Sequence, residues 1–276
     1  MINTNIELKD VFGAVTGGVV TTYILDSSHE VDANRKRPAV IICPGGAYRL
    51  CSEREAECFA VRFMAMGYHA FVLNYRVDEA RFPEQFKEVA ATIALLRDKA
   101  DEWHIEADKI AVMGFSAGGH LAGTLGTMWN SPILTDAFNM DSETFKPNAV
   151  ILSYPVITSG EFAHQGSFDN LLGAEKDPQL VHDLSLENAV GPHVPQTFIW
   201  HTLGDTTVPC ENSLLLAQEL RKNNVPFELH IFPEGRHGLA LVNEETAPPS
   251  MLDEYVLPHT AQWFNLCCDW LATRFK

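Results

Sequence analysis

The segment GFSAG, at positions 114–118, fits the pattern G-x-S-x-G. It follows the apolar run KIAVMGF and precedes residues of helical pattern, so Ser116 falls at a turn between a buried strand and a helix. Such a turn is so tight that Gly114 and Gly118 are needed on either side, because larger side chains would meet the neighbouring strand and helix. The helix N-terminus would favour negative charge that develops at the serine. The segment therefore predicts a nucleophilic serine, with a plain glycine-rich turn as the alternative.

A serine nucleophile needs a histidine as its base and a carboxylate that orients the histidine. In folds with this serine turn, the chain order is serine, acid, histidine. Asp205 in HTLGDTTVP and His237 in PEGRHGLAL satisfy that order, and each directly follows an expected strand. Asp205 could instead only form an Asx turn, and His237 could be an exposed loop residue. Their joint position at strand ends favours a catalytic triad of Ser116, Asp205 and His237.

Other histidines and carboxylates compete for these two roles. His120 lies one helical turn beyond Ser116 and His201 lies inside an expected strand, so we interpret both as packed, hydrogen-bonded histidines. Asp205 alone has the strand-end position, and we therefore keep it as the acid. Four other carboxylates that follow the serine could in principle supply the acid: Asp169, Asp177, Asp183 and Glu211.

Acyl chemistry through a tetrahedral intermediate also needs donors for the oxyanion. The segment CPGGAY at 43–48 follows a β-branched run and resembles the HGGG-type loop that supplies backbone N–H groups in lipases and esterases. We predict that the N–H groups of Gly46, Ala47 and Ala117 form the oxyanion hole. The loop departs from the pattern at Pro44, which replaces the histidine, and at Ala47, which replaces the third glycine but keeps its N–H group.

Composition and charge narrow the classes of function. The chain has 276 residues, of which 46% are hydrophobic, and we expect one domain over 1–276. A formal net charge of -16 would repel phosphate backbones and anionic lipids, which argues against nucleic acid and membranes as partners. The sequence has no apolar run of about 18 residues and no signal-peptide pattern, so we expect a cytoplasmic protein. Cysteines and histidines lack metal-ligand spacing, so we expect reduced thiols and no metal. The oligomeric state is left open.

Strands and helices alternate along the chain. Most of the expected strands lack polar alternation, so both faces would be covered, as in a parallel sheet flanked by helices. We therefore predict a doubly wound, mostly parallel α/β sheet with helices on both faces. Ser52 and Glu55 have capping-box spacing at the start of the first helix. The strands are expected at 19–25, 38–44, 69–75, 109–115, 148–154, 196–202 and 227–233, and the helices at 52–66, 85–103, 211–222 and 259–275.

One long insertion, at 155–195, interrupts this alternation and is rich in polar residues, glycine and proline. Because loops at strand ends line the sites of α/β folds, we interpret it as a small cap, with a plain surface excursion as the alternative. Tyr48 and Arg49, beside the oxyanion loop, could help to close a small acyl pocket, or could only pack against the loop or solvate it. Polar residues of the insertion, which suit a hydroxyl-rich alcohol better than a lipid, are Ser159, Glu161, His164, Gln165, Ser167, Asp169 and Asn170.

Motifs along nearly the whole chain resemble the α/β-hydrolase superfamily, and more narrowly the bacterial acetyl esterase and feruloyl/acetyl xylan esterase group related to the hormone-sensitive lipase family. The resemblance implies the α/β-hydrolase fold and hydrolysis of short acyl esters, such as acetyl groups on plant-derived sugars, without metal or organic cofactor. The motifs are PGGAYRLCSEREAECFAVRFMAMGYHAFVLNYRV, GFSAGGHLAG, NLLG and WHTLGDTTVPCENSLLLAQELRKNNVPFELHIFPEGRHGLAL.

The leading hypothesis is a serine carboxylesterase that acts on small acetylated carbohydrates, such as xylo-oligosaccharides, through an acyl-enzyme on Ser116. A serine peptidase of the prolyl-oligopeptidase type has the same fold and triad, but it carries a large N-terminal propeller, whereas the first expected strand of this chain starts at residue 19. A non-catalytic binder is the third possibility, although binding alone does not require a nucleophile, acid and base in order. The sequence does not identify the sugar or the acyl position.

Overall fold

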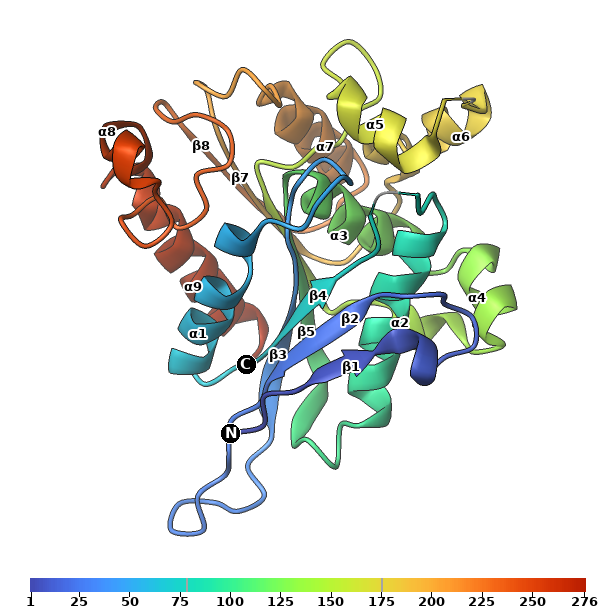
Figure 1. The fold of residues 1–276 in the computed structure, drawn as a ribbon, viewed down its shortest axis with the longest axis vertical. Helices are drawn as coiled ribbons and strands as arrows, with labels where there is room; N and C mark the ends of the chain where they lie inside the picture. The colour runs from blue at the N-terminus through green and yellow to red at the C-terminus, as the bar shows by residue number, and fades with distance from the viewer. Residues whose placement is uncertain (78, 175) are drawn as a thin grey trace.

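The computed structural model describes residues 1–77, 79–174 and 176–276. Within these residues, eight strands form one sheet in the order β1-β2-β4-β3-β5-β6-β7-β8, and helices cover both of its faces (Figure 1). The strands are β1 (Asn5–Glu7), β2 (Val19–Tyr23), β3 (Arg37–Cys43), β4 (His69–Asn74), β5 (Ile105–Phe115), β6 (Ala149–Ser153), β7 (Thr197–Thr202) and β8 (Phe227–Phe232).

The sheet is parallel from β4 to β8, whereas β1 and β2 pair antiparallel at one edge. This arrangement confirms the predicted mostly parallel, doubly wound sheet, and every expected strand is present. Strand β1 was not predicted, because its three residues, NIE, carry no apolar run. Parallel strands bring their carboxyl ends to one edge of the sheet. The loops that follow β3, β5, β7 and β8 therefore meet at that edge.

The helices divide between the two faces of the sheet. Helices α1 and α9 pack on one face through aromatic residues such as Phe59 and Trp263, and α2, α3 and α7 pack on the other through residues such as Val89, Leu125 and Leu216. Two separate apolar cores result, one on each face. The helices are α1 (Glu57–Ala65), α2 (Glu84–Asp98), α3 (Ser116–Met128), α4 (Pro132–Phe138), α5 (Gln165–Leu172), α6 (Pro178–Asp183), α7 (Glu211–Lys222), α8 (Leu252–Tyr255) and α9 (Trp263–Arg274).

The prediction of one helix over 52–66 that starts with a capping box is wrong in its first part. The chain forms a short 3-10 turn at Glu53–Glu55, and α1 begins only at Glu57. Glu55 is buried, and its Oε2 accepts a hydrogen bond from the backbone N–H of Gly45 at 2.8 Å. The carboxylate therefore serves the loop that follows β3, and not the end of a helix.

The insertion at 155–195 folds over the carboxyl edge of the sheet, where Figure 1 shows α5 and α6 above α3. Phe168 and Leu171 of α5 are buried in the core on the face that α2, α3 and α7 cover. Asn170, also on α5, donates a hydrogen bond from Nδ2 to the carbonyl oxygen of Ala47 at 2.8 Å. The insertion is therefore packed directly against the loop that follows β3.

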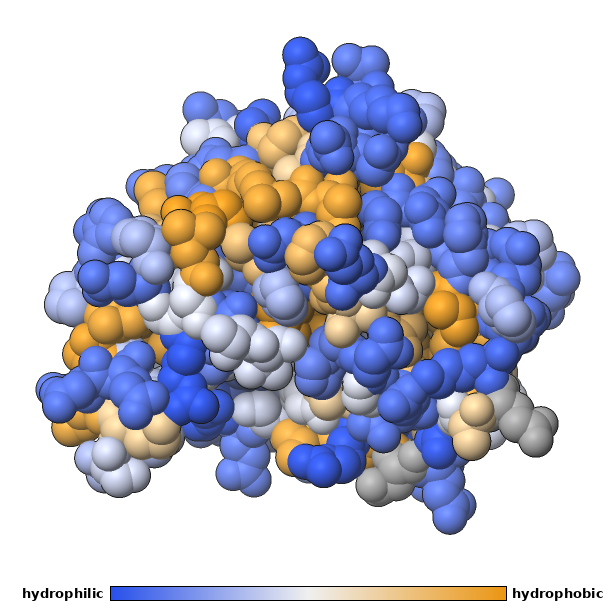
Figure 2. Space-filling model, turned by 90° about the horizontal axis from the view of Figure 1, so that it is seen from above, coloured by the Kyte–Doolittle hydropathy of each residue, from blue (hydrophilic) through white to orange (hydrophobic). Residues whose placement is uncertain are grey.

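Figure 2 looks down on the molecule from the upper end of Figure 1 and shows apolar atoms gathered in one area with hydrophilic side chains around it. Large apolar side chains exposed in loops that follow strands include Leu50 and Leu203. In the described part of the chain, no helix is both long and apolar enough to cross a membrane. All six cysteines are free thiols.

The turn at Ser116 depends on glycine on both sides. A Cβ atom at Gly114 would overlap the carbonyl oxygen of Gly118, and one at Gly118 would overlap the carbonyl oxygens of Cys43 and Pro44. These neighbours are backbone atoms, so they cannot move aside without shifting β3, β5 or α3. The two glycines thus allow the close crossing of strand and helix that the sequence pattern predicts.

We expect Gly118→Ala to lower the free energy of unfolding by about 1–3 kcal/mol or more, because it overpacks a site bounded by backbone. Gly13→Ala is the matched control, since an added Cβ there would meet no atom within 4 Å. Urea unfolding followed by circular dichroism measures both. Equal stability of the two variants would contradict this account of the turn.

Candidate active site

Three side chains from three separate loops meet in one hydrogen-bonded row at the carboxyl edge. Ser116 begins α3, Asp205 lies in the loop after β7, and His237 lies in the loop after β8. His237 Nε2 is 2.7 Å from Ser116 Oγ, and His237 Nδ1 is 2.6 Å from Asp205 Oδ2. The structure therefore brings together the three residues that the sequence analysis selected as nucleophile, base and acid.

The backbone of Ser116 is left-handed, with φ of 52°, and the residue is buried. A positive φ is uncommon for a residue with a side chain and costs on the order of 1–3 kcal/mol. Here it turns the chain sharply from β5 into α3 and directs Oγ toward His237. This geometry is that of the nucleophile turn expected from the G-x-S-x-G pattern.

Asp205 has a different partner on each carboxylate oxygen. Oδ1 accepts hydrogen bonds from the backbone N–H groups of Thr207 and Val208 at 3.0 and 2.9 Å, which is the Asx turn considered above, and Oδ2 faces His237. Because a carboxylate only accepts, His237 carries its proton on Nδ1 and presents the lone pair of Nε2 to the hydroxyl of Ser116. Asp205 can thus form the Asx turn and orient His237 at the same time.

His201 is a further neighbour of Asp205 that the sequence analysis did not connect with it. Its Nε2 lies 2.9 Å from the carbonyl oxygen of Val208 and 3.3 Å from Asp205 Oδ2. Both groups are acceptors, so Nε2 carries the proton, and Nδ1 accepts from Ser213 Oγ at 2.7 Å. Burial alone would raise the pKa of Asp205, but the hydrogen bonds from His201 and His237 outweigh it and hold that pKa below its usual value. Asp205 is therefore ionised at neutral pH.

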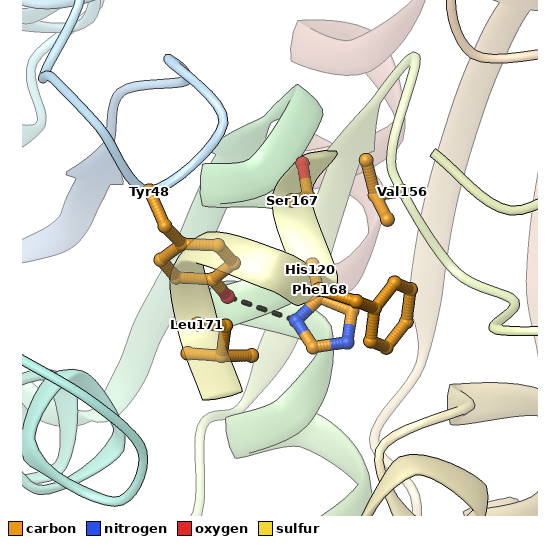
Figure 3. A pocket seen from close by; sticks show the side chains of 6 residues that line it. All are labelled: Tyr48, His120, Val156, Ser167, Phe168 and Leu171. Atoms are coloured by element: carbon orange, nitrogen blue, oxygen red, sulfur yellow. Dashed lines mark hydrogen bonds between the residues drawn. The ribbon is translucent and has the colours of Figure 1, made fainter. Parts of the chain in front are cut away.

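His120 takes the structural role that its position in the helix indicated. Its Nδ1 lies 2.8 Å from the hydroxyl of Tyr48, and its Nε2 lies 2.8 Å from the carbonyl oxygen of Leu184 in the insertion. Figure 3 shows this pair of rings with Phe168 and Leu171 of α5 beside them. Burial lowers the pKa of His120 to about 4, so the imidazole is neutral at neutral pH. Both of its nitrogens are occupied, and it holds the insertion in place.

Tyr48 and Arg49 have different surroundings. The side chain of Tyr48 is buried with its hydroxyl on His120, and Tyr48 is not among the described residues that line the cleft at Ser116. These contacts fit the alternative considered above, in which Tyr48 packs against the loop, and the role in an acyl pocket stays a prediction. Arg49 lines the cleft.

The loop after β3 has residues with positive φ angles. Gly46 and Ala47 have φ of 132° and 55°, and a Cβ at Gly46 would overlap the carbonyl oxygen of Leu50. Within residues 1–77, 79–174 and 176–276, no protein group accepts a hydrogen bond from the N–H of Gly46, Ala47 or Ala117. Gly46 and Ala47 also line the cleft at Ser116, so the assignment of the three donors to an oxyanion hole stays a prediction.

A cleft of about 280 Å³ opens over Ser116. Its polar lining includes Arg54 and His164, and the latter lies at the start of α5 with Nδ1 2.9 Å from Ser167 Oγ. No group of three or more His, Cys, Asp or Glu side chains in the described residues could hold a metal ion. The lining residues are Gly46, Ala47, Arg49, Leu50, Ser52, Arg54, Glu55, Ser116, His164, Thr207, His237 and Gly238.

Comparison with known families places this chain among related proteins. The profile of the BD-FAE family matches residues 25–220, which is most of the chain. The chain belongs to the BD-FAE family. The match confirms the resemblance to esterases of the α/β-hydrolase type that the sequence motifs carry, and the eight-stranded sheet has the topology of that fold.

Two curated relatives of this BD-FAE family member are enzymes named for xylan chemistry. The chain is 36% identical over 219 residues to Endo-1,4-beta-xylanase B of Butyrivibrio fibrisolvens, and 34% identical over 206 residues to Acetylxylan esterase of Xylanibacter ruminicola. These matches cover 76% and 72% of this chain but only 34% and 40% of the relatives. The chain therefore spans well under half the length of the curated relatives it matches.

Solved structures match this BD-FAE family member over nearly its full length. An acetyl ester-xyloside bifunctional hydrolase from Caldicellulosiruptor lactoaceticus shares 38% identity with a TM-score of 0.80, and the match covers 94% of this chain and 88% of that one. A carboxylesterase from Lactobacillus plantarum shares 29% identity with a TM-score of 0.87, and covers 99% and 98%. These likenesses confirm the α/β-hydrolase fold.

The geometry of this site predicts reaction with a serine-directed fluorophosphonate, in which Ser116 Oγ would displace fluoride from phosphorus. His237→Asn should slow the labelling of Ser116 by at least about 10³-fold, because the hydroxyl loses the base that takes its proton. Mass spectrometry of the labelled peptide measures the rate. His182→Asn, an exposed residue on α6, is the control, and equal labelling of the two variants would contradict the assignment of His237.

Proposed function

We propose that this chain is a serine carboxylesterase that removes short acyl groups, above all acetyl, from small carbohydrates such as xylo-oligosaccharides. The observation that carries the proposal is the row of hydrogen bonds from Asp205 through His237 to Ser116, which opens on a cleft with unpaired backbone N–H groups. The esterase names of several relatives support the reaction class, and their xylan and xyloside names support the substrate class.

The reaction would proceed in two acyl-transfer steps. Ser116 Oγ attacks the ester carbonyl carbon while His237 Nε2 takes the hydroxyl proton, and the resulting oxyanion is bound by the N–H groups of Gly46, Ala47 and Ala117. The intermediate collapses as the carbon–oxygen bond to the alcohol breaks, and His237 returns its proton to the leaving oxygen. Water then attacks the acyl-enzyme in the same way and releases the carboxylic acid. Asp205 stabilises the imidazolium in both steps.

The size and lining of the cleft favour a short acyl group and a polar alcohol. A volume of about 280 Å³ lies at the lower limit of ordinary ligand pockets. Arg49, Arg54 and His164 supply hydrogen-bond donors that a hydroxyl-rich sugar can use, whereas Leu50 is the one large apolar side chain in the described lining. In this proposal the insertion at 155–195 is the cap over the alcohol side of the site, and it contributes His164.

Two other activities, cleavage of xylosides and cleavage of peptides, compete with this proposal. A xylosidase needs two carboxyl groups on either side of the glycosidic bond, but Glu55 is the only carboxylate in the described lining, and Gly45 and Tyr154 occupy its two oxygens. A serine peptidase would use the same triad on an amide. The cleft geometry favours the esterase over the xylosidase, and substrate comparison separates esterase from peptidase.

Ser116→Ala should lower kcat for p-nitrophenyl acetate by up to about 10⁶-fold, because the reaction then lacks its nucleophile. The variant should remain folded, since the substitution removes one hydroxyl and keeps the backbone. Stopped-assay kinetics and a thermal melt measure the two effects. A variant that is folded and keeps a tenth of the wild-type rate would overturn the proposal.

Asp205→Asn should lower kcat by roughly 10⁴-fold, which is less complete than the loss of Ser116 or His237, because the acid orients and stabilises the base without touching the substrate. Asp183→Asn, a change of the same kind on the exposed surface of α6, is the matched control and should leave kcat within a factor of two. Steady-state kinetics with p-nitrophenyl acetate compare the two variants. A similar rate in both would remove Asp205 from the triad.

Activity should be highest on acetyl and propionyl esters and should fall for acyl chains of eight carbons. An open apolar channel would gain about 0.8 kcal/mol per buried methylene, so a rate that falls with chain length reports a short pocket. The measurement is kcat/KM for p-nitrophenyl acetate, butyrate and octanoate, then for acetylated xylo-oligosaccharides, p-nitrophenyl xyloside and a proline-containing peptide amide. A maximum at octanoate, or faster cleavage of the xyloside or the peptide than of any ester, would contradict the proposal.

A further inference from the structure

Glu55 is a buried carboxylate beside Ser116 that the triad mechanism does not use. Its side chain is 3% exposed. Oε2 accepts from the backbone N–H of Gly45 at 2.8 Å, and Oε1 accepts from the hydroxyl of Tyr154 at 2.6 Å. A buried charge is unfavourable unless it is hydrogen-bonded. Here two donors satisfy it, and they come from two different parts of the active site.

The first donor belongs to the oxyanion loop. Gly45 immediately precedes Gly46 and Ala47, which line the cleft. A Cβ at Gly45 would lie 2.7 Å from Glu55 Oε2 and 2.8 Å from the carbonyl oxygen of Phe115, so the loop is seated tightly between the carboxylate and the end of β5. The hydrogen bond from Gly45 to Glu55 thus fixes the position of the peptide groups of Gly46 and Ala47.

The second donor, Tyr154, contacts the loop that carries His237. Tyr154 follows β6, and its hydroxyl oxygen accepts from the backbone N–H of Ala240 at 3.0 Å while its proton goes to Glu55. Its ring also packs edge-on against the ring of His237, with centroids 5.2 Å apart. Burial, together with the charge of Glu55, raises the pKa of Tyr154 well above its usual value, so the phenol remains a donor.

We propose that Glu55 is a positioning residue for the reaction: through Gly45 on one side and Tyr154 on the other, it fixes the oxyanion donors relative to His237. The inference rests on the proposed esterase function. A carboxylate suits this position because both of its oxygens accept, whereas a glutamine offers one acceptor and one donor. Glutamine at 55 must therefore give up one of the two contacts or turn the Tyr154 hydroxyl away.

Charge and position predict opposite effects of Glu55→Gln. A negative charge near the oxyanion opposes its formation, so removal of that charge alone would raise the rate. If Glu55 instead acts by holding the loop after β3 in place, the substitution displaces the oxyanion donors and the rate falls. A slower variant thus reports the role of position, and a faster one reports a role of charge.

The experiment compares Glu55→Gln and Tyr154→Phe with a matched pair from the same region. Tyr23 donates from its hydroxyl to Glu57 Oε2 at 2.9 Å, which is a hydrogen bond of the same kind at an exposed carboxylate away from the cleft. Glu57→Gln and Tyr23→Phe are therefore the controls. Each variant is assayed for kcat and KM with p-nitrophenyl acetate and for the affinity of a trifluoromethyl ketone, whose adduct with Ser116 carries an oxyanion.

Glu55→Gln should lower kcat and the affinity for the trifluoromethyl ketone by a similar factor, about 10- to 100-fold, with KM within about threefold of the wild type. Tyr154→Phe keeps the carboxylate and its bond to Gly45, and should lose about tenfold. The double variant should lose less than the product of the single effects, because the two residues form one network. Both controls should stay within twofold.

Unchanged kcat in folded Glu55→Gln, or equal losses in the control pair, would overturn the positioning role while leaving the esterase function intact. If the wild type hydrolyses no ester, the esterase function fails instead, and the rate of fluorophosphonate labelling of Ser116 then tests Glu55. If Glu55→Gln does not fold, Tyr154→Phe decides, since it removes only a hydroxyl: wild-type kcat and ketone affinity in that variant would overturn the proposal.

Discussion

The crossing of β5 and α3 at Ser116 is the constraint on which the rest of the site depends. At this point three backbone segments lie in contact: the end of β3, the end of β5 and the first turn of α3. No side chain fits between them, which is why glycine stands at 114 and 118. The same crossing holds Ser116 in a left-handed conformation and directs its hydroxyl away from the sheet. The loops that carry the other site residues are then arranged around a fixed point.

Buried polar contacts hold those loops in place. Asn170 of the insertion binds the carbonyl oxygen of Ala47, and His120 joins Tyr48 to the carbonyl oxygen of Leu184. Each contact joins a side chain to the loop after β3 or to the insertion. An unpaired polar group at these buried positions would cost about 1–3 kcal/mol. The loops therefore gain a preferred position from the same bonds that satisfy their backbone.

The sequence predicted the sheet and the triad because both leave local signals. An apolar run between turn residues indicates a strand, and Asp205 and His237 could be selected because each directly follows such a run. The contacts of Glu55 and His201 leave no such signal, since each depends on which segments the fold brings together. Glu55 even fitted a capping box by spacing, but the helix starts two residues later and its carboxylate turns to Gly45. The burial of Tyr48 leaves no local signal either, because it depends on contacts with α5.

The positions of some site residues are therefore determined by the ends of strands, and the positions of others by contacts between loops. A strand end places a residue at the correct edge of the sheet, to within a few ångströms. Catalysis by oriented donors needs a finer tolerance, since a displacement of about 1 Å can lower a rate by about 10²-fold. In this structure Tyr154 and Asn170 are placed to supply that finer adjustment, and neither forms a hydrogen bond with Ser116 or His237. The fold thus supplies the location of the chemistry, and buried hydrogen bonds between loops supply its geometry.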